Sequence, residues 1–239
     1  MKNGTKSSEI FGIRVASSQL PEVIERIKTE IEKRDYNMPF FMVTAYSETL
    51  LVAQENQEFK KMLEKADLIV ADGVSLWMAK DYLNGKNFLK MYEDRPTGVK
   101  IFETFLRNRR YKKFLFGGFS GVAGRLAEVF GCYWSEEDPK IIEKINRCKP
   151  DILFVALGRV KQELWIADNL SKLKCKVIVG VGSAFDEVAG EGMWARPVPS
   201  WAEKMGLKWL WRARGDPKHW IRAFRAAVVF PWRVYRTYA

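Results

Sequence analysis

Five short stretches of this 239-residue chain place glycines and polar side chains directly after apolar runs of strand length. They are residues 44–48 (TAYSE), 72–73 (DG), 117–121 (GGFSG), 158–163 (GRVKQE) and 180–185 (GVGSAF). Glycine lets backbone N–H groups approach an anion, and a helix that begins behind such a turn favours a diphosphate. Together the five stretches predict a nucleotide-binding site.

Each stretch taken alone also has a purely structural interpretation. GVGSAF lacks the third glycine of GxGxxG, and an aspartate followed by glycine, as at Asp72, often caps a helix instead of acting as a base. Lys161 would stand in the first turn of a helix, where the helix dipole disfavours a cation, so its position hints at an anionic ligand. Asp186 and Glu187 are expected on a solvated helix face. For Asp72, capping and catalysis both stay open.

The elements that must position these stretches alternate along the chain. Apolar runs predict strands at residues 10–15, 39–44, 67–71, 113–117, 151–157 and 176–181. Apolar residues at helical spacing predict helices at residues 20–33, 48–65, 74–83, 121–130, 139–147 and 161–173, with one more from about residue 97. The alternation predicts an α/β fold with a mostly parallel, doubly wound sheet. Ligands of such sheets bind at the carboxyl ends of the strands, where all five stretches fall.

Composition narrows the class of partner and the compartment. The net charge of +11 and the isoelectric point near 9.5 imply an anionic partner, which could be nucleic acid, an acidic lipid surface or a phosphorylated substrate. Cys132, Cys148 and Cys175 form no CxxC pair, which argues against a disulfide framework and a zinc site and favours a reducing cytoplasm. No apolar run approaches the roughly 18 to 20 residues that cross a bilayer, so we expect neither secretion nor a membrane span.

The order of the motifs is similar to that of one enzyme family. Thr44 precedes Ser47-Glu48 by three residues, Asp72-Gly73 closes the next strand, and Arg95 is followed by Gly98. Four more motifs follow in order along the chain: the GGxxG turn, LGRVKQELWI, GVGSAFDEVAG, and ARPVPSWAEKMGLKWLWR with Asp-Pro after it. This combination resembles the WecG/TagA/CpsF glycosyltransferases, glycosyltransferase family 26, from about residue 11 to the C-terminus.

The resemblance implies an inverting, metal-independent transferase with a Rossmann-like sheet, peripheral to the cytoplasmic face of a bacterial membrane. Such an enzyme moves a hexose derivative (an N-acetylmannosamine-type sugar, its uronic acid or glucose) from a UDP-sugar to a saccharide on a polyprenyl diphosphate. The product would enter a cell-surface polysaccharide or wall polymer. The expected partners are the UDP-sugar, the lipid-linked acceptor and an anionic membrane surface, and a homo-oligomer is allowed. No metal or other cofactor is expected, and the chain has no DxD motif.

The resemblance also assigns roles to residues. Asp72 maps onto the general base that takes the proton of the acceptor hydroxyl. Arg212 and Arg222 best match the arginines that hold the diphosphate. The expected donor-binding residues are Thr44, Tyr46, Gly73, Arg95, Gly117, Gly118, Gly158, Lys161, Gln162, Glu163 and Gly182.

Two departures from the family pattern stand out. Tyr46 occupies the position at which the family usually has asparagine, so a different donor sugar or a loss of activity becomes conceivable. Residues 130–139 look about a dozen residues shorter than in the family, where another strand usually lies. The number of strands is therefore left open.

The last 31 residues carry about six of the eleven net positive charges. A helix is predicted from residue 217 to about residue 230, where Pro231 should end it. Its apolar arc lies beside a basic stripe, which is typical of a helix that rests on an anionic membrane. The expected membrane-contacting residues are Trp220, Phe224, Arg225, Trp232 and Arg233.

Other interpretations of the chain stay open. The terminal helix could dock its aromatic stripe on the domain, or its arginines and aromatic rings could bind nucleic acid, although no helix-turn-helix, RRM or zinc-finger signature occurs. We expect a Rossmann-like core over residues 1–195 and a helical, membrane-contacting appendage over residues 196–239, and no nucleic acid. Two alternatives to a glycosyltransferase stay open: a catalytically inactive membrane-bound scaffold and a basic nucleic-acid-binding protein. A nicotinamide-dependent oxidoreductase is disfavoured, because no GxGxxG motif follows the first strand.

Overall fold

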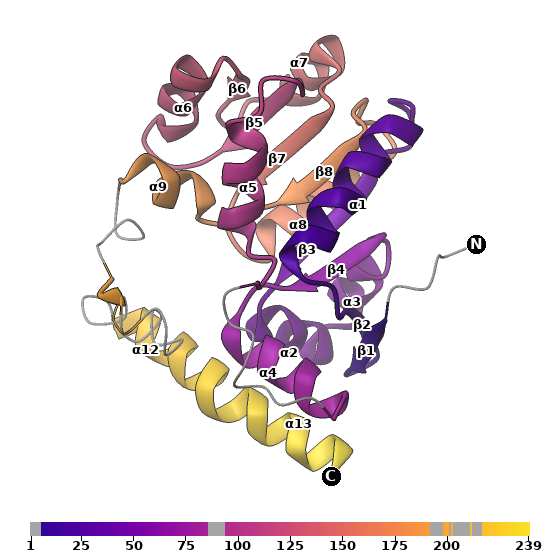
Figure 1. Cartoon of the computed structure of the whole chain (residues 1–239), viewed down its shortest axis with the longest axis vertical. Coiled ribbons are helices and arrows are strands. Elements are labelled where there is room, and N and C mark those ends of the chain that lie inside the picture. The colour runs from indigo at the N-terminus through magenta and orange to yellow at the C-terminus, as the bar shows by residue number, and fades with distance from the viewer. Residues whose placement is uncertain (1–5, 86–93, 192–197, 201, 203–210, 212–216) are drawn as a thin grey trace.

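A computed structural model describes residues 6–85, 94–191, 198–200, 202, 211 and 217–239. Within these residues one sheet has eight strands in the order β1-β2-β4-β3-β8-β7-β5-β6 (Figure 1). The strands are β1 (Ser7–Ile10), β2 (Ile13–Ala16), β3 (Phe40–Ala45), β4 (Leu68–Ala71), β5 (Lys113–Gly117), β6 (Tyr133–Ser135), β7 (Ile152–Ala156) and β8 (Val177–Gly180).

All neighbouring strands except β1 and β2 run parallel, which confirms the predicted α/β fold with a mostly parallel sheet. All six residues of β3 are buried, because helices cover both faces of the sheet, as the continuous apolar run predicts. One face packs against α2 (Ser47–Glu55), α3 (Gln57–Leu63), α4 (Val74–Leu83), α7 (Ile141–Cys148) and α8 (Lys161–Asn169). The other face packs against α1 (Leu20–Lys33), α5 (Gly98–Leu106), α6 (Val122–Phe130) and α9 (Ala184–Ala189).

Several predicted elements differ from those in the structure. The extended start at residues 10–15 is an antiparallel hairpin, β1–β2, which turns at Phe11 and Gly12, both with positive φ. The helix expected over residues 48–65 is two helices, because Asn56 adopts an extended backbone and its side chain accepts a hydrogen bond from the Phe59 N–H at 3.0 Å. An Asn that caps a new helix in this way interrupts the preceding one.

Residues 130–139, for which the sequence analysis left the number of strands open, contain the short strand β6. β6 pairs in parallel with β5, so that Phe114 aligns with Tyr133 and Phe116 with Ser135. β6 has only three residues, and the side chains of its two aromatic residues are exposed. So short a segment has no apolar pattern from which a strand can be predicted. Pairing with β5 supplies the hydrogen bonds that stabilise β6.

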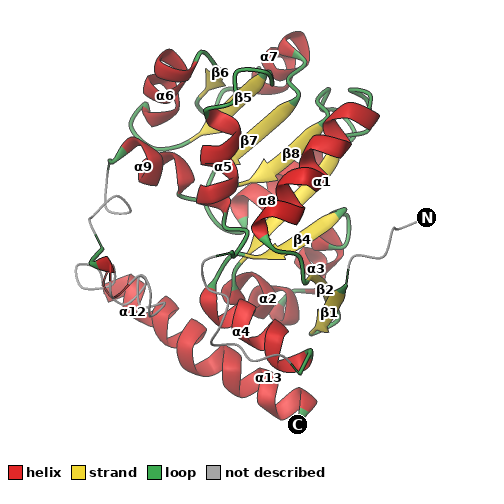
Figure 2. Cartoon of the chain, viewed as in Figure 1, coloured by secondary structure: helices red, strands yellow, loops and turns green. Residues whose placement is uncertain are grey.

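The C-terminal segment forms a continuous helix from residue 217 to residue 238, so the prediction that Pro231 ends it is wrong (Figure 2). It comprises α12 (Pro217–Phe224), a π-helical segment (Arg225–Val229) and α13 (Phe230–Tyr238). In a regular α-helix the Pro231 ring would clash with the carbonyl four residues earlier. The π-helical segment widens the preceding turn, so that the Phe230 N–H reaches the Arg225 carbonyl five residues back, and the helix continues.

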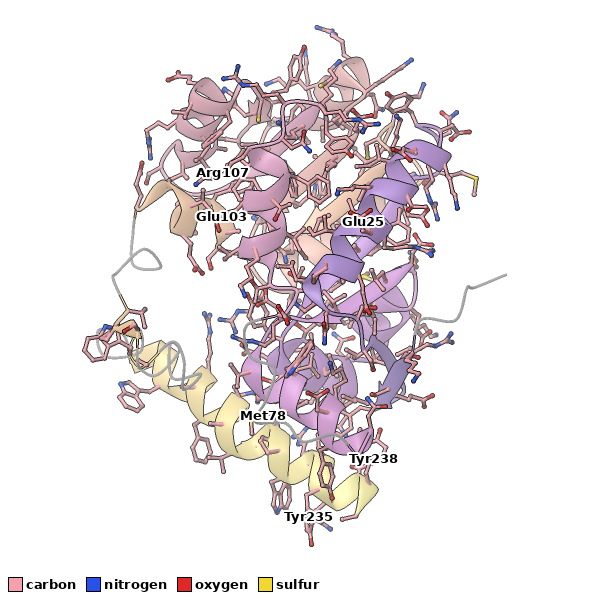
Figure 3. All side chains as sticks on the ribbon, viewed as in Figure 1. Glu25, Met78, Glu103, Arg107, Tyr235 and Tyr238 are labelled. Carbon is pink, nitrogen blue, oxygen red and sulfur yellow. The ribbon has the colours of Figure 1, made fainter. Side chains whose placement is uncertain are left out.

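The second half of this helix packs on the core. Phe230 and Val234 are buried in the cluster that covers one sheet face. The Phe11 ring meets the Phe230 ring edge-on at 5.9 Å, and the Phe11 N–H donates to the Tyr238 hydroxyl at 2.7 Å. Figure 3 shows α13 alongside α4, with the side chain of Tyr235 pointing away from the core. No helix among the described residues is both long enough and apolar enough to cross a membrane.

The expected division of the chain at residues 195/196 falls outside the described residues. In the described part, α13 and the sheet share one hydrophobic cluster. One side of the terminal helix therefore packs on the rest of the protein. The sequence analysis had left such docking open as an alternative to membrane contact. The opposite side remains exposed.

Candidate active site

The carboxyl ends of β3 and β8 meet at a topological switch point of the sheet. β3 is followed by α2 on one face, and its neighbour β8 is followed by α9 on the other face. Ligands of open α/β sheets bind outside the strand ends at such a point. Thr44 and Tyr46 lie at the end of β3, Gly182 follows β8, and Asp72 follows β4, which pairs with β3.

Asp72 is buried at this edge and does not cap the helix that follows it. Gly73 is the N-cap of α4, whereas the Asp72 carboxylate Oδ2 accepts a hydrogen bond from the Gly98 N–H at 2.9 Å, at the start of α5. The Arg95 guanidinium Nη1 donates to the Asp72 carbonyl oxygen at 3.3 Å. The carboxylate is therefore held by a segment 26 residues further along the chain.

Burial raises the pKa of Asp72 from 3.8 to about 6. The hydrogen bond from the Gly98 N–H, the neighbouring Tyr46 hydroxyl and the positive charge of Arg95 lower this pKa, and the negative charge of Glu187 raises it further. A carboxylate with this pKa is mostly ionised at pH 7 and accepts a proton more readily than an exposed aspartate. These are the properties of a general base.

Thr44 connects β3 to β8. Its hydroxyl donates to the Gly180 carbonyl oxygen at 2.8 Å. Gly98 approaches the same strand ends so closely that a Cβ atom at this position would lie 3.2 Å from both Thr44 Oγ1 and the Val181 carbonyl oxygen. A glycine at the start of α5 therefore lets the helix approach β3 and β8 while it holds Asp72.

Gln162 and Glu163 connect α8 to the loop after β8, and both side chains are almost completely buried. The Gln162 amide donates to Glu163 Oε1 at 3.0 Å and accepts from the Gly182 N–H at 3.0 Å. Burial raises the pKa of Glu163, whose Oε2 has no hydrogen-bond partner within the described residues. Gln162 thus fixes the position of Gly182.

Two charged side chains in this region were not expected to contribute. The Arg159 guanidinium lies over the Tyr46 ring, 5.0 Å from its centroid, and its Nη1 pairs with Glu48 Oε2 at 2.8 Å. Both residues stood inside stretches that the sequence analysis singled out. Their positions within those stretches, next to strand ends, were the available signal, but the sequence analysis assigned no role to either residue.

The prediction that Asp186 and Glu187 form a solvated helix face is wrong for Asp186. Its side chain is 7% exposed, and burial raises its pKa. Glu187 is half-buried, accepts a hydrogen bond from the Ser183 hydroxyl at 3.3 Å, and its negative charge acts on Asp72 and Tyr46. Both residues lie in the first turn of α9, which begins four residues after the end of β8.

The remaining glycine-containing loops lie along the same edge. Gly117 and Gly118 have φ of 91° and 87°, and a Cβ atom on Gly117 would lie 2.8 Å from the Ala156 carbonyl oxygen. Gly158 also has a positive φ. These backbone positions favour glycine for conformational reasons alone.

Lys161 lies toward the β5–β6 side of the edge. Its ammonium group pairs with Glu137, which follows β6. Both side chains line a shallow pocket of about 320 Å³ together with Phe116, Ile141, Leu157 and Trp165. The structure therefore places Lys161 beside β6 and separates it along the sheet from Asp72, which follows β4.

The tail residues separate into an inner and an outer group. Arg212 lies outside the described residues, and Arg222 is exposed on α12. Arg225 and Arg233, expected at the membrane, instead pair with Glu55 of α2 at 3.0 Å and 3.1 Å. The helical phase turns these two guanidinium groups toward α2.

The outer group of tail residues is apolar and exposed. Trp220, Phe224 and Trp232 are 51%, 59% and 55% exposed, and Ile221, Val228 and Tyr235 are exposed as well. Large apolar side chains gathered on one face of a helix mark an interaction surface. In the described part of the chain, no three His, Cys, Asp or Glu side chains come together as a set of metal ligands.

Comparisons with known proteins agree with this geometry. A model of the glycosyl transferase WecG/TagA/CpsF family matches residues 8–239. Among curated proteins, the chain is 25% identical over 248 residues to an N-acetylglucosaminyldiphosphoundecaprenol N-acetyl-beta-D-mannosaminyltransferase of Staphylococcus aureus strain MRSA252, covering 98% of this chain and 94% of the relative. The enzymes with the same name from strains MW2 and NCTC 8325 are 25% identical over 249 residues, with the same coverage.

Proposed function

Because the chain belongs to the glycosyl transferase WecG/TagA/CpsF family, we propose that it transfers a hexose derivative from a UDP-sugar to a saccharide carried on a polyprenyl diphosphate. The observation that carries this proposal is the buried Asp72 carboxylate at the switch point of the sheet. The curated relatives are named for transfer of N-acetylmannosamine to N-acetylglucosaminyldiphosphoundecaprenol. An N-acetylmannosamine-type sugar is therefore the first donor to test, followed by its uronic acid and glucose.

The proposed reaction inverts the anomeric carbon. The acceptor hydroxyl oxygen forms a bond to this carbon while the bond to the UDP oxygen breaks on the opposite side. The hydroxyl proton moves to the Asp72 carboxylate, which the Gly98 N–H holds in place. Inversion follows because the acceptor and the leaving group occupy opposite faces of the sugar.

The departing UDP gains negative charge, which fixed positive groups stabilise without a metal ion. Arg95, next to Asp72, is the arginine that we place nearest to the reaction. Arg222 and Arg212 are proposed to bind diphosphate from the tail. The remaining donor-binding residues are proposed to be Thr44, Tyr46, Gln162 and the glycines at the strand ends.

We place the enzyme at the cytoplasmic face of a bacterial membrane as a peripheral protein. The acceptor is anchored in the bilayer by its prenyl chain, so the active site must reach the membrane surface. The exposed apolar side of the C-terminal helix is the proposed contact, with Trp220, Phe224 and Trp232 in the headgroup region. Since Arg225 and Arg233 are paired with Glu55, they are not included.

The test is a turnover assay with purified protein, a panel of UDP-sugars and polyprenyl-diphosphate-linked N-acetylglucosamine. We expect one UDP-sugar to be consumed, with or without EDTA, and NMR of the product to show an inverted anomeric configuration. Retained configuration would contradict the mechanism, and loss of turnover in EDTA that Mg²⁺ restores would contradict the metal-independent route. A folded protein that turns over no UDP-sugar would support the inactive scaffold instead.

A further inference from the structure

We propose that Glu163 is a positioning residue of the donor site. Its carboxyl group holds the Gln162 amide in one orientation, and this amide in turn fixes the Gly182 N–H in the loop after β8. The inference rests on the proposed function, in which Gln162 and the glycines at the strand ends bind the UDP-sugar. It gives Glu163 an indirect role in place of the direct donor contact that the sequence predicts.

The turn before α8 brings Gln162 and Glu163 to the end of β8. The helix begins at Lys161 and packs next to β8 (Figure 1). Its N-cap, Val160, has a φ of 66°. A β-branched residue rarely adopts this conformation, which costs free energy and persists only where the surrounding structure imposes it. Backbone strain of this kind is typical of functional sites.

The hydrogen bonds of the Gln162 amide allow only one orientation. Its Nε2 donates to Glu163 Oε1 at 3.0 Å, and its Oε1 accepts from the Gly182 N–H at 3.0 Å. If the amide were turned over, its oxygen would face the carboxyl oxygen and its NH₂ group would face the Gly182 N–H, so neither hydrogen bond would form. Glu163 therefore determines which end of the amide faces the loop after β8.

Burial protects these contacts from water. Gln162 and Glu163 are 1% and 2% exposed. Burial raises the pKa of Glu163, but Oε1 accepts from Gln162 whether or not Oε2 carries a proton, so the amide is held in both ionisation states. Burying an amide and a carboxyl group costs free energy, and a pair of apolar side chains of the same shape would fold as well. Packing alone therefore gives no reason for this pair.

The end of β8 is held from both sides. On the β3 side, the Thr44 hydroxyl donates to the Gly180 carbonyl oxygen at 2.8 Å. On the α8 side, the Gln162 amide lies so close to Gly180 that a Cβ atom there would be 3.0 Å from its Nε2. Because α9 begins at Ala184, two residues after Gly182, its first turn shares this fixed position. Backbone groups that are already in place bind a ligand without the cost of ordering them.

The experiment compares wild type with Glu163→Leu, which removes the acceptor, and Glu163→Gln, which keeps an acceptor oxygen but no charge. The first measurement is hydrogen exchange of the Gly182 N–H, followed by ¹H–¹⁵N NMR in the protein without ligand. In Glu163→Leu this N–H should exchange about tenfold faster, because the Gln162 amide no longer holds it. In Glu163→Gln its exchange should stay within about twofold of wild type, because the amide keeps its partner.

Steady-state kinetics give the second measurement. Glu163→Leu should raise the KM for the UDP-sugar about five- to twentyfold while kcat falls less than about threefold, because the loop binds the donor and Asp72 keeps its own contacts. The KM for the lipid-linked acceptor should not change. Glu163→Gln should restore the donor KM to within about twofold of wild type. Asp168→Leu, which replaces an exposed carboxylate on the same helix, is the matched control and should change neither measurement.

Three results would overturn the inference. The first is wild-type exchange of the Gly182 N–H in Glu163→Leu. The second is an equal loss in Glu163→Gln and Glu163→Leu, because the charge and not the acceptor would then matter. The third is faster exchange of the Gly182 N–H with an unchanged donor KM, because the loop would then not serve donor binding.

Two further points keep the test decisive. If Glu163→Leu does not fold, Gly180→Ala replaces it, because the added Cβ would displace the Gln162 amide and should also speed exchange of the Gly182 N–H. Unchanged exchange in that variant would overturn the inference. If the protein turns over no UDP-sugar, the proposed function fails, and the exchange rates still decide whether Glu163 holds the loop after β8.

Discussion

At the scale of single residues, burial of the Asp72 carboxylate raises its pKa and lowers the stability of the folded protein at neutral pH. Its folded-state pKa of about 6 lies above the unfolded value of 3.8, so the folded protein holds this proton more tightly. Stability from this group is therefore fully present below about pH 4 and is lost as the pH rises through 6. The difference amounts to about 2 to 3 kcal/mol at neutral pH. The residue suits catalysis because its burial disfavours the charged form.

Asp72→Asn should therefore lower turnover by roughly a hundredfold or more without lowering the melting temperature at pH 7.5. An asparagine still accepts the Gly98 hydrogen bond through its amide oxygen but carries no buried charge. Turnover assays and thermal melts at pH 5 and pH 7.5 test both parts. A variant that melts well below wild type at pH 7.5 would contradict the assignment of burial as the main cause of the pKa shift.

Gly98→Ala tests the approach of α5 to the strand ends. The added Cβ would lie 3.2 Å from Thr44 Oγ1 and from the Val181 carbonyl oxygen, and a backbone carbonyl cannot move far. We expect a loss of about 1 to 3 kcal/mol in the free energy of unfolding. The acidic limb of the pH profile should also move up, because the Gly98 N–H moves away from Asp72. Unchanged stability and an unchanged limb would show that the contact is not needed.

At the scale of elements, the C-terminal helix is held by its inner face. The π-helical segment lets it pass Pro231, and Arg225 and Arg233 reach Glu55 from positions eight residues apart. The Arg233 guanidinium also donates to the Gln54 amide oxygen at 2.8 Å. Because polar contacts and the buried Phe230 and Val234 share this face, the apolar residues on the opposite side remain free for another surface.

Glu55→Gln should loosen this attachment without unfolding the core. Each ion pair is partly exposed and contributes little, typically below about 1 kcal/mol, so amide exchange in residues 225–238 should rise by about two- to tenfold. Hydrogen exchange with mass spectrometry measures the change segment by segment. Glu58→Gln, an exposed acid on α3, is the control and should leave these rates unchanged. Equal exchange in both variants would mean that apolar packing alone holds the helix.

At the scale of the whole molecule, positive charge and exposed apolar side chains gather on the C-terminal helix, which is why we propose a membrane contact there. The chain carries a net charge of +11, and about six of these charges lie in the last 31 residues. Arg225 and Arg233 share the single Glu55 carboxylate, whereas Arg222 and Arg236 are exposed on the same helix as the exposed aromatic residues. Removing the helix would also expose the core around Phe230, so substitutions on its outer face are the cleaner test.

Trp220→Ala and Phe224→Ala should each reduce flotation with anionic liposomes, because both rings are exposed on the outer face. Arg222→Ala should mainly reduce turnover, since we place its charge on the diphosphate. Tyr82→Ala, an exposed aromatic on α4, is the control for flotation. Raised salt should weaken binding of wild type, as charges are screened over about 8 to 10 Å at physiological ionic strength. Equal flotation of all variants would contradict the membrane contact.

The sequence by itself determined the fold class and placed the five candidate stretches at one edge of the sheet. Continuous apolar runs such as that of β3 indicate strands covered on both faces, and alternation with helices requires parallel connections, so the strand-end loops must share one edge. Asp72 could be placed on that edge for this reason alone. These inferences depend on local patterns, which the chain carries whatever its tertiary contacts.

Only the tertiary structure decided how the residues at that edge and in the tail are used. The Asp72 carboxylate accepts a hydrogen bond from the Gly98 N–H, 26 residues further along the chain, and Gly73 is the N-cap of α4, so Asp72 does not cap that helix. On the C-terminal helix, Arg225 and Arg233 pair with Glu55, whereas Arg222 is exposed to solvent. Which side chains face α2 depends on the rotation of the helix about its own axis, and the π-helical segment changes this rotation. A side chain's pKa and partners depend on what distant segments pack against it, and no local pattern encodes that packing.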